Sequence, residues 1–190
     1  MLQQPLAFRS TASSASLSGV DEARLRRTVD TNFDALWRFL RRLGIPEGDV
    51  DDAVQEVILV LARKLDQVQE GREKSFVLST AFRVASDMRR TVKRRREVDE
   101  AALLGLASQT PDPEAATETH RLSVLFAQVL EQLSLEQRAV FVLYELEDFT
   151  MAEIAQTLAL RPGTVASRLR RGRETFERLA AQALGHGAQP

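Results

Sequence analysis

Apolar residues recur at helical spacing along almost the whole chain, and this feature restricts its fold more than any other. From residue 21 to residue 184, nearly every segment places leucine, valine or alanine three or four positions apart, which aligns them on one face of an α-helix. The alternating β-branched runs that indicate strands are absent. The sequence therefore predicts an all-α protein.

Breaks in this spacing divide the chain into two helical bundles. The helical pattern fades after residue 96 and resumes after a Pro- and Asp-containing stretch that ends at Pro113, as is typical of a linker. We expect bundles at 21–96 and 114–184, a flexible linker at 97–113, and disordered tails at 1–20 and 185–190.

Local signals mark several helix ends. Gly44 followed by Pro46 ends the first helix, at about residue 43. Ser134 with Gln137, and Thr150 with Glu153, are capping boxes that predict helices from about 135 to 146 and from 151 to 158. Pro162 fits the first position of a last helix.

Composition excludes several classes of function. The chain has no cysteine and two histidines, so neither a thiolate nor a zinc site is expected. Because it has no Gly-rich phosphate loop and no nucleophile with a nearby base, we expect neither catalysis nor a cofactor. No apolar run approaches the roughly 20 residues of a spanning helix, and the start is unlike a secretion signal, so we expect a cytoplasmic protein without membrane insertion.

Charge is segregated along the chain although the net charge is only −1. Basic residues concentrate at 89–96 and 168–173, and acidic residues at 47–56, 99–118 and 145–153. Such segregation produces local fields of opposite sign, which attract different partners.

The segment from 151 into the last helix has the outline of a helix-turn-helix. Val165, Leu169 and Gly172 face inward, which leaves a polar outer face of Thr164, Ser167, Arg168 and Arg171 near the helix start. Hydroxyl and guanidinium groups there can reach bases and phosphates in a major groove. The other interpretation is a solvated Arg-rich face of an ordinary bundle.

The third helix carries a second basic surface, made of Arg83, Asp87, Arg90 and Arg94 and followed by more arginines. We interpret it as a surface that follows DNA phosphates, with Phe76, Phe82 or Met88 available to support unstacked bases. Alternatively, Asp87 pairs with Arg83 or Arg90 and the remaining charge serves solubility.

The second helix leaves acidic and aliphatic residues outside its core stripe: Asp52, Gln55, Glu56 and Leu59, with Val60 nearby. An acidic surface with exposed aliphatics suits a partner protein helix. Equally, Leu59 and Val60 could pack on the linker or on the other bundle.

Five segments together resemble a known family, the extracytoplasmic-function sigma factors of bacterial RNA polymerase. Residues 49–57 and 76–96 resemble its second conserved region, and residues 133–143, 153–155 and 163–169 are similar to its fourth. The order and spacing of these segments make the combination specific. Phe76 stands where the family usually has Trp, Arg83 where it often has Asn, and Ala166 where Lys is frequent.

The resemblance implies a role for each surface. Asp52, Gln55 and Glu56, beside Leu59, would contact the clamp coiled coil of core RNA polymerase. The surface of Arg83, Asp87, Arg90 and Arg94 would lie at the minus-ten promoter element. The residues in the minus-thirty-five major groove would be Thr164, Ser167, Arg168 and Arg171, with Arg161 and Pro162 at its edge.

In this family the linker threads toward the RNA exit path, and an anti-sigma factor commonly holds the protein inactive. The resemblance thus implies core RNA polymerase and promoter DNA as partners. A free-standing helix-turn-helix regulator, whose first bundle would dimerise or sense a signal, is the alternative. It predicts tight binding to palindromic DNA without polymerase.

Overall fold

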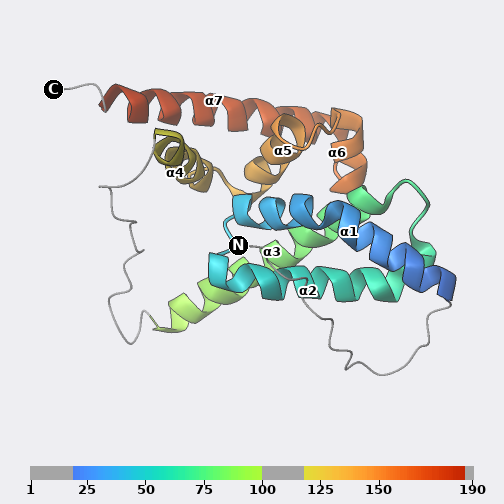
Figure 1. Cartoon of the computed structure of the whole chain (residues 1–190). Coiled ribbons are helices and arrows are strands. Elements are labelled where there is room, and N and C mark those ends of the chain that lie inside the picture. The colour runs from blue at the N-terminus through green and yellow to red at the C-terminus, as the bar shows by residue number, and fades with distance from the viewer. Residues whose placement is uncertain (1–18, 100–117, 187–190) are drawn as a thin grey trace.

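The protein is all-α, as the sequence predicts. The computed structural model describes residues 19–99 and 118–186, and within these ranges it contains helices and their connections only (Figure 1). The elements are α1 (Gly19–Arg42), α2 (Glu47–Lys64), the short 3₁₀ helix η1 (Leu65–Gln67), α3 (Glu73–Asp99), α4 (Glu118–Glu131), α5 (Leu135–Glu145), α6 (Met151–Thr157) and α7 (Pro162–His186).

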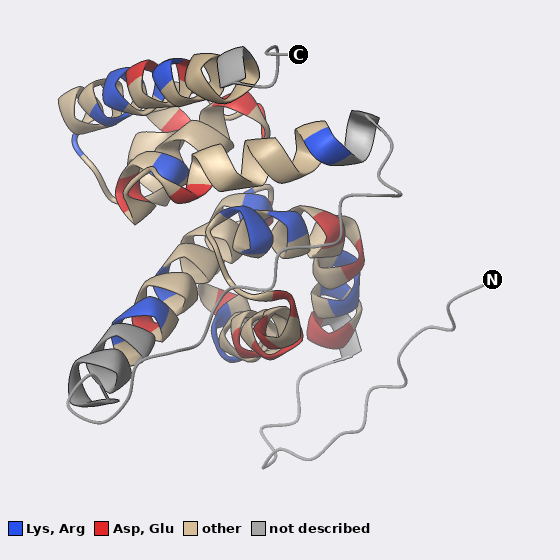
Figure 2. Ribbon diagram, turned by 90° about the vertical axis from the view of Figure 1, so that its left-hand side faces the viewer, with Lys and Arg blue, Asp and Glu red and all other residues tan. Residues whose placement is uncertain are grey.

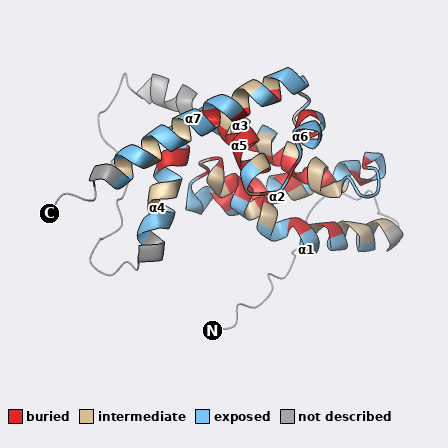
Figure 3. Ribbon diagram, turned by 90° about the horizontal axis from the view of Figure 1, so that it is seen from above, coloured by how far each residue is buried: buried red, intermediate tan, exposed pale blue. Residues whose placement is uncertain are grey.

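Helices α1, α2 and α3 pack on one another and form the first bundle. Leucines and valines that repeat at helical spacing fill the space between them, and the buried set includes Leu40, Leu43, Val50, Leu61 and Leu78. Figure 3 shows buried residues where the helices cross and exposed ones on their outer faces. Burial of these apolar faces is the main stabilising contribution in such a bundle.

Arg24 ties the start of α1 to the connection between α2 and α3. Its guanidinium donates to the carbonyls of Leu65 and Val68, and its Nη2 lies 2.8 Å from a carboxylate oxygen of Glu73. Burial alone raises the pKa of Glu73, but the bonds from Arg24 and from backbone N–H groups outweigh it and lower the pKa. Sequence periodicity gave no sign of this contact.

Helices α4 to α7 form the second bundle. Phe176 of α7 lies between two aromatic partners, at 5.4 Å from the ring centroid of Phe126 and 5.0 Å from that of Phe141. Gly172 lies where α7 packs on α5, and a Cβ there would be in ordinary van der Waals contact with Leu133 and the Gln137 carbonyl.

The ends of the elements differ slightly from the expected boundaries. Helix α3 continues to Asp99, past the expected start of the linker, and α7 continues to His186. The remainder of the expected linker, and the tail residues 1–18 and 187–190, lie outside the described residues.

The two bundles are in direct contact. The α5–α6 connection and α6 of the second bundle lie against α1 and the start of α3 of the first (Figure 1). This contact joins the two apolar interiors into a continuous buried cluster. No pattern in the sequence predicted the relative orientation of the two bundles.

Candidate nucleic-acid interface

A capping box starts the helix-turn-helix, as the sequence predicts. The Glu153 N–H donates to Thr150 Oγ1 at 3.3 Å, and the Thr150 N–H donates to Glu153 Oε2 at 2.8 Å. These bonds from the backbone and hydroxyl of Thr150 lower the pKa of Glu153. The carboxylate is thus fixed at the positive end of α6, where the first-turn N–H groups have no helical acceptor.

The turn between α6 and α7 depends on a residue in an unusual conformation. Ala159 has a φ of +52°, in the left-handed region that non-glycine residues seldom adopt. The Leu160 N–H donates to the Ala155 carbonyl at 2.8 Å, and the Ala159 N–H donates to the Gln156 carbonyl at 3.3 Å. This paired pattern ends α6 and turns the chain into α7 within four residues.

Helix α7 begins at Pro162, as expected, and its first turns have two distinct faces. Val165 and Leu169 are buried against the rest of the second bundle. On the other side, Arg161, Pro162 and Arg171 are exposed, and Thr164, Ser167 and Arg168 are half-buried. The structure therefore brings the six predicted residues together at one end of one helix.

The arginines of α7 fall into two groups. Arg170 pairs with Glu174 at 2.7 Å, and Arg173 pairs with Glu145 and stacks over the Tyr144 ring. Arg161, Arg168 and Arg171 form no ion pair with any described residue. Arg178, further along α7, also has no ion pair with a described residue. Arg161, Arg168 and Arg171 are the ones that lie together beside the helix start, where long donors can reach phosphates and guanine bases.

The predicted basic surface of α3 is present in part. Arg83, Asp87 and Arg90 are exposed, and Arg90 lies 3.8 Å from Asp87 across one turn. An exposed pair at this distance contributes little to stability, so the expected pairing of Asp87 exists without neutralising the surface. Arg94 lies on α3, but its side chain is outside the described part. Figure 2 shows the basic residues in the described parts of α3 and α7 in blue.

One arginine of this run is structural. The Arg89 Nη1 donates at 3.2 Å to the carbonyl of Leu43, beyond the last turn of α1. Phe76, Phe82 and Met88 are partly buried against the core, so only part of each is accessible to a base.

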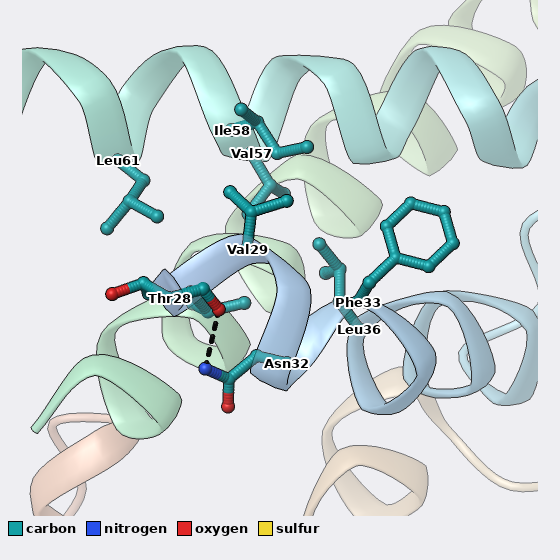
Figure 4. A pocket seen from close by; sticks show the side chains of 9 residues that line it. Thr28, Val29, Asn32, Phe33, Leu36, Val57, Ile58 and Leu61 are labelled. Carbon is teal, nitrogen blue, oxygen red and sulfur yellow. Dashed lines mark hydrogen bonds between the residues drawn. The ribbon is translucent and has the colours of Figure 1, made fainter. Parts of the chain in front are cut away.

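The acidic surface of α2 is exposed as predicted. Asp52, Gln55 and Glu56 point away from the core, and Leu59 is 37% exposed. Phe33 of α1, which the sequence reasoning did not select, is 38% exposed. It lines, with Ile58 of α2, a cavity of about 10 Å³ that has room for no more than about one water (Figure 4). Phe33 therefore adds exposed apolar surface beside Ile58 of α2, which the sequence did not indicate.

No group of His, Asp or Glu in 19–99 and 118–186 could hold a metal ion. None of the helices in those ranges has the length and apolar character needed to cross a membrane.

Comparison with known proteins identifies both bundles. Residues 28–96 match the family described as Sigma-70 region 2, and residues 123–176 match Sigma-70, region 4. The RNA polymerase sigma-E factor of Streptomyces coelicolor is 33% identical over 75% of this chain and 78% of its own length. The ECF RNA polymerase sigma factor SigE of Mycolicibacterium smegmatis is 28% identical over 96% of this chain and 69% of its own. The chain belongs to the extracytoplasmic-function sigma factors.

This sigma factor therefore directs RNA polymerase to promoters. A solved structure of similar fold is the sigma factor RpoE in complex with the anti-sigma factor NepR from Bartonella quintana. It has a TM-score of 0.67 and 19% identity, and the match covers 82% of this chain and 96% of that one. The region 2 match covers most of α1 to α3, and the region 4 match covers most of α4 to α7.

Proposed function

We propose that this sigma factor divides transcription initiation among three surfaces. The α2 surface of Asp52, Gln55, Glu56 and Leu59 binds the clamp coiled coil of core RNA polymerase. The α3 surface binds the minus-ten element, and the start of α7 binds the minus-thirty-five element. The two functional domains are then 21–96 and 114–184, and the chain has no catalytic activity of its own.

The observation that carries this proposal is the set of unpaired arginines at the helix-turn-helix. Arg168 and Arg171 lack acidic partners among the described residues, whereas Arg170 and Arg173, on the same helix, have them. Because the first turns of a recognition helix enter the major groove, these guanidinium groups would reach guanine edges. Arg161, Pro162, Thr164 and Ser167 would complete the contact surface.

The α3 surface fits melted DNA. Arg83 and Arg90, with Arg94 further along the helix, supply positive charge for phosphates, and the exposed parts of Phe76 and Met88 supply apolar surface for unstacked bases. We infer that strand separation at the minus-ten element uses this helix.

The α2 surface fits a protein. Four neighbouring side chains, acidic, amide and aliphatic, are exposed without an ion pair to a described residue. Charged rims around exposed apolar groups are typical of helix-binding surfaces.

Regulation by a partner is the remaining part of the proposal. RpoE and CnrH, from two solved structures that resemble this chain, are seen in complex with the anti-sigma factor NepR and with the cytosolic domain of CnrY. We infer that this chain acts in the cytoplasm and that an anti-sigma factor binds it and holds it inactive.

The test is co-purification with bacterial core RNA polymerase, followed by run-off transcription from a pooled promoter library. Binding together with selective initiation would support the proposal and reveal the promoter. Specific duplex-DNA binding without polymerase binding would instead identify a free-standing helix-turn-helix regulator.

A further inference from the structure

A single carboxylate links the two bundles. Glu147, in the α5–α6 connection, has a side chain only 4% exposed. Its Oε1 accepts from Arg42 Nη1 at 3.2 Å, and its Oε2 lies 3.6 Å from Lys74 Nζ, which also donates to the Glu147 carbonyl at 3.2 Å. Arg42 is the last residue of α1 and Lys74 lies in the first turn of α3, so both cations come from the first bundle.

Two neighbouring contacts extend this cluster. The Lys74 ammonium lies 5.2 Å from the ring centroid of Phe149, which is itself buried. Arg72 Nη1 donates to Gln156 Oε1 of α6 at 2.9 Å. The cluster thus joins the first bundle to the helix that precedes the DNA-reading helix.

The backbone of the α5–α6 connection presents Glu147 and Phe149 to the first bundle. Asp148 between them has a φ of +59°, and the Phe149 N–H donates to the Leu143 carbonyl at 3.0 Å. A buried carboxylate is tolerated only while it keeps its cationic partners, because an uncompensated buried charge is strongly unfavourable. Glu147 therefore favours the arrangement in which the bundles touch.

The same interface also contains an unfavourable element. Arg138 of α5 is buried beside Gly44, and its Nε and Nη1 have no hydrogen-bond partner among the described residues. Burial and the positive charge of Arg89 lower the pKa of Arg138 to about 10, and Glu131 offsets this only in part. Separation of the bundles would hydrate these nitrogens. The burial of Arg138 therefore favours the open arrangement and opposes the contribution of Glu147.

The closed arrangement is also too short for a promoter. The minus-ten and minus-thirty-five promoter elements are centred about 25 base pairs apart, as their names state. This separation is about 85 Å at 3.4 Å per base pair. A compact chain of 190 residues has a radius of gyration of about 16 Å and is about 40 Å across. A body of this size cannot place one bundle on each element.

We propose that the Glu147 cluster (Glu147, Arg42, Lys74, Phe149, Arg72 and Gln156) is a latch that keeps the free sigma factor closed. It must open before the two bundles engage the two promoter elements together. The claim that the latch inhibits initiation rests on the proposed function. The claim that the free protein is closed does not.

The first test measures the distance between the bundles in the full chain. The protein has no cysteine, so Arg63→Cys on α2 and Glu177→Cys on α7, both exposed, create the only two attachment sites for spin labels. Pulsed electron resonance should give one short distance for this labelled parent, and Glu147→Lys should shift the distribution to longer, broader distances. A broad distribution in the parent, or an unchanged one in Glu147→Lys, would overturn the latch.

Matched variants separate the latch from general damage to the fold. Glu145→Gln breaks the ion pair with Arg173 inside the second bundle, two positions away, and should leave the distance unchanged. Adding Arg42→Glu and Lys74→Glu to Glu147→Lys exchanges the charges across the same contact and should restore the short distance. Circular dichroism checks that every variant keeps its helix content, and Glu147→Gln gives a milder form of the same change.

The second test measures the affinity for core RNA polymerase. If only the open form binds core enzyme, the small population of that form in the parent protein weakens the apparent affinity. Glu147→Lys should increase the open population and therefore bind core enzyme at least about threefold more tightly. Opening without tighter binding would remove the inhibitory role. If neither the parent nor the variant binds polymerase while the distances still change, the proposed function fails and the closed state stands.

Discussion

One helix in each bundle, α1 in the first and α6 in the second, ends with the same hydrogen-bond pattern. The residue with a positive φ differs between these two helix ends. In the first bundle, Gly44 has a φ of +88°, and the Ile45 N–H donates to the Leu40 carbonyl at 3.2 Å. In the second, Ala159 has a φ of +52°, and the Leu160 N–H donates to the Ala155 carbonyl at 2.8 Å. The first turn connects α1 to α2, and the second connects α6 to α7.

The difference shows where each turn gets its stability. Glycine adopts a positive φ without steric cost, whereas a residue with a Cβ loses about 1–2 kcal/mol there. Ala159 persists because Ile154 and Val165 on either side of the turn are buried in one core. The first turn is thus set locally, and the second is imposed by packing.

The bundles also distribute their charged surfaces differently. In the first, the acidic surface and the basic surface occupy different helices, α2 and α3. In the second, α7 carries core residues on one face and the unpaired arginines on the other. Substitutions on the two faces of α7 should therefore separate stability from DNA reading.

The largest expected effect comes from the outer face of α7. Arg168→Ala with Arg171→Ala should reduce initiation at the cognate promoter about a hundredfold, because each good base contact contributes about 1–3 kcal/mol. Core-polymerase binding should not change. Run-off transcription and polymerase pull-down measure the two quantities.

Two matched variants make this result specific. Arg170→Ala removes a neighbouring arginine that pairs with Glu174, and it should leave promoter choice intact. Asp52→Ala with Gln55→Ala in the first bundle should have the opposite effect to the α7 pair: binding to core polymerase should be lost, and the promoter-reading surface should be unaffected. If both pairs gave the same defect, the division between the bundles would be wrong.

The next effect tests the glycine turn of the first bundle. Gly44→Ala should lower the free energy of unfolding by about 1–2 kcal/mol, since a Cβ is strained at positive φ. In addition, that Cβ would lie 2.5 Å from Arg138 Nη1. Gly48→Ala on α2, with no atom within 4 Å, is the control and should not destabilise the protein. Denaturant titration measures both, and equal stabilities would contradict a locally set turn.

A smaller effect concerns helix starts. Pro46, the N-cap residue of α2 in the first bundle, provides no side-chain cap, whereas α5 and α6 both begin with capping boxes. Ser134→Ala and Thr150→Ala should each cost about 1 kcal/mol of stability, because a first-turn N–H loses its acceptor. Thermal unfolding measures the loss, and Thr91→Ala within α3, where the hydroxyl caps nothing, serves as the control.

The Thr150 cap adds a dependence on pH. The folded pKa of Glu153 is lowered, so its contribution is present above the ordinary Glu range and is lost as the pH falls through the lowered value. The difference between the parent protein and Thr150→Ala should therefore shrink in acid. A constant difference down to that range would mean that Glu153 takes no part in the cap.

The smallest effect is a gain. Ala159→Gly should stabilise the second bundle by about 0.5–1 kcal/mol, because relief of the positive φ exceeds the added freedom of the unfolded chain. Chemical denaturation followed at the second bundle measures it. A loss of stability would show that the Ala159 side chain contributes packing that outweighs its strain.

Local signals in the sequence predicted most of the elements. Gly44, the capping boxes at Ser134 and Thr150, and Pro162 each satisfy or remove backbone groups at a helix end within a few residues. The exposed residues of the three surfaces followed from helical periodicity. The strained turn at Ala159 carried no such signal, because alanine is ordinarily a residue of helix interiors.

The sequence by itself determined the all-α class, most helix ends, and which faces carry charge, since these depend on residues a few positions apart. Only the tertiary structure decided how the bundles meet. Arg42 and Glu147, which are 105 positions apart, pair across the interface, and Arg89 donates to the end of α1. Apolar burial drives the helices together without direction, so the charged groups that meet at their edges depend on the final packing and leave no local pattern.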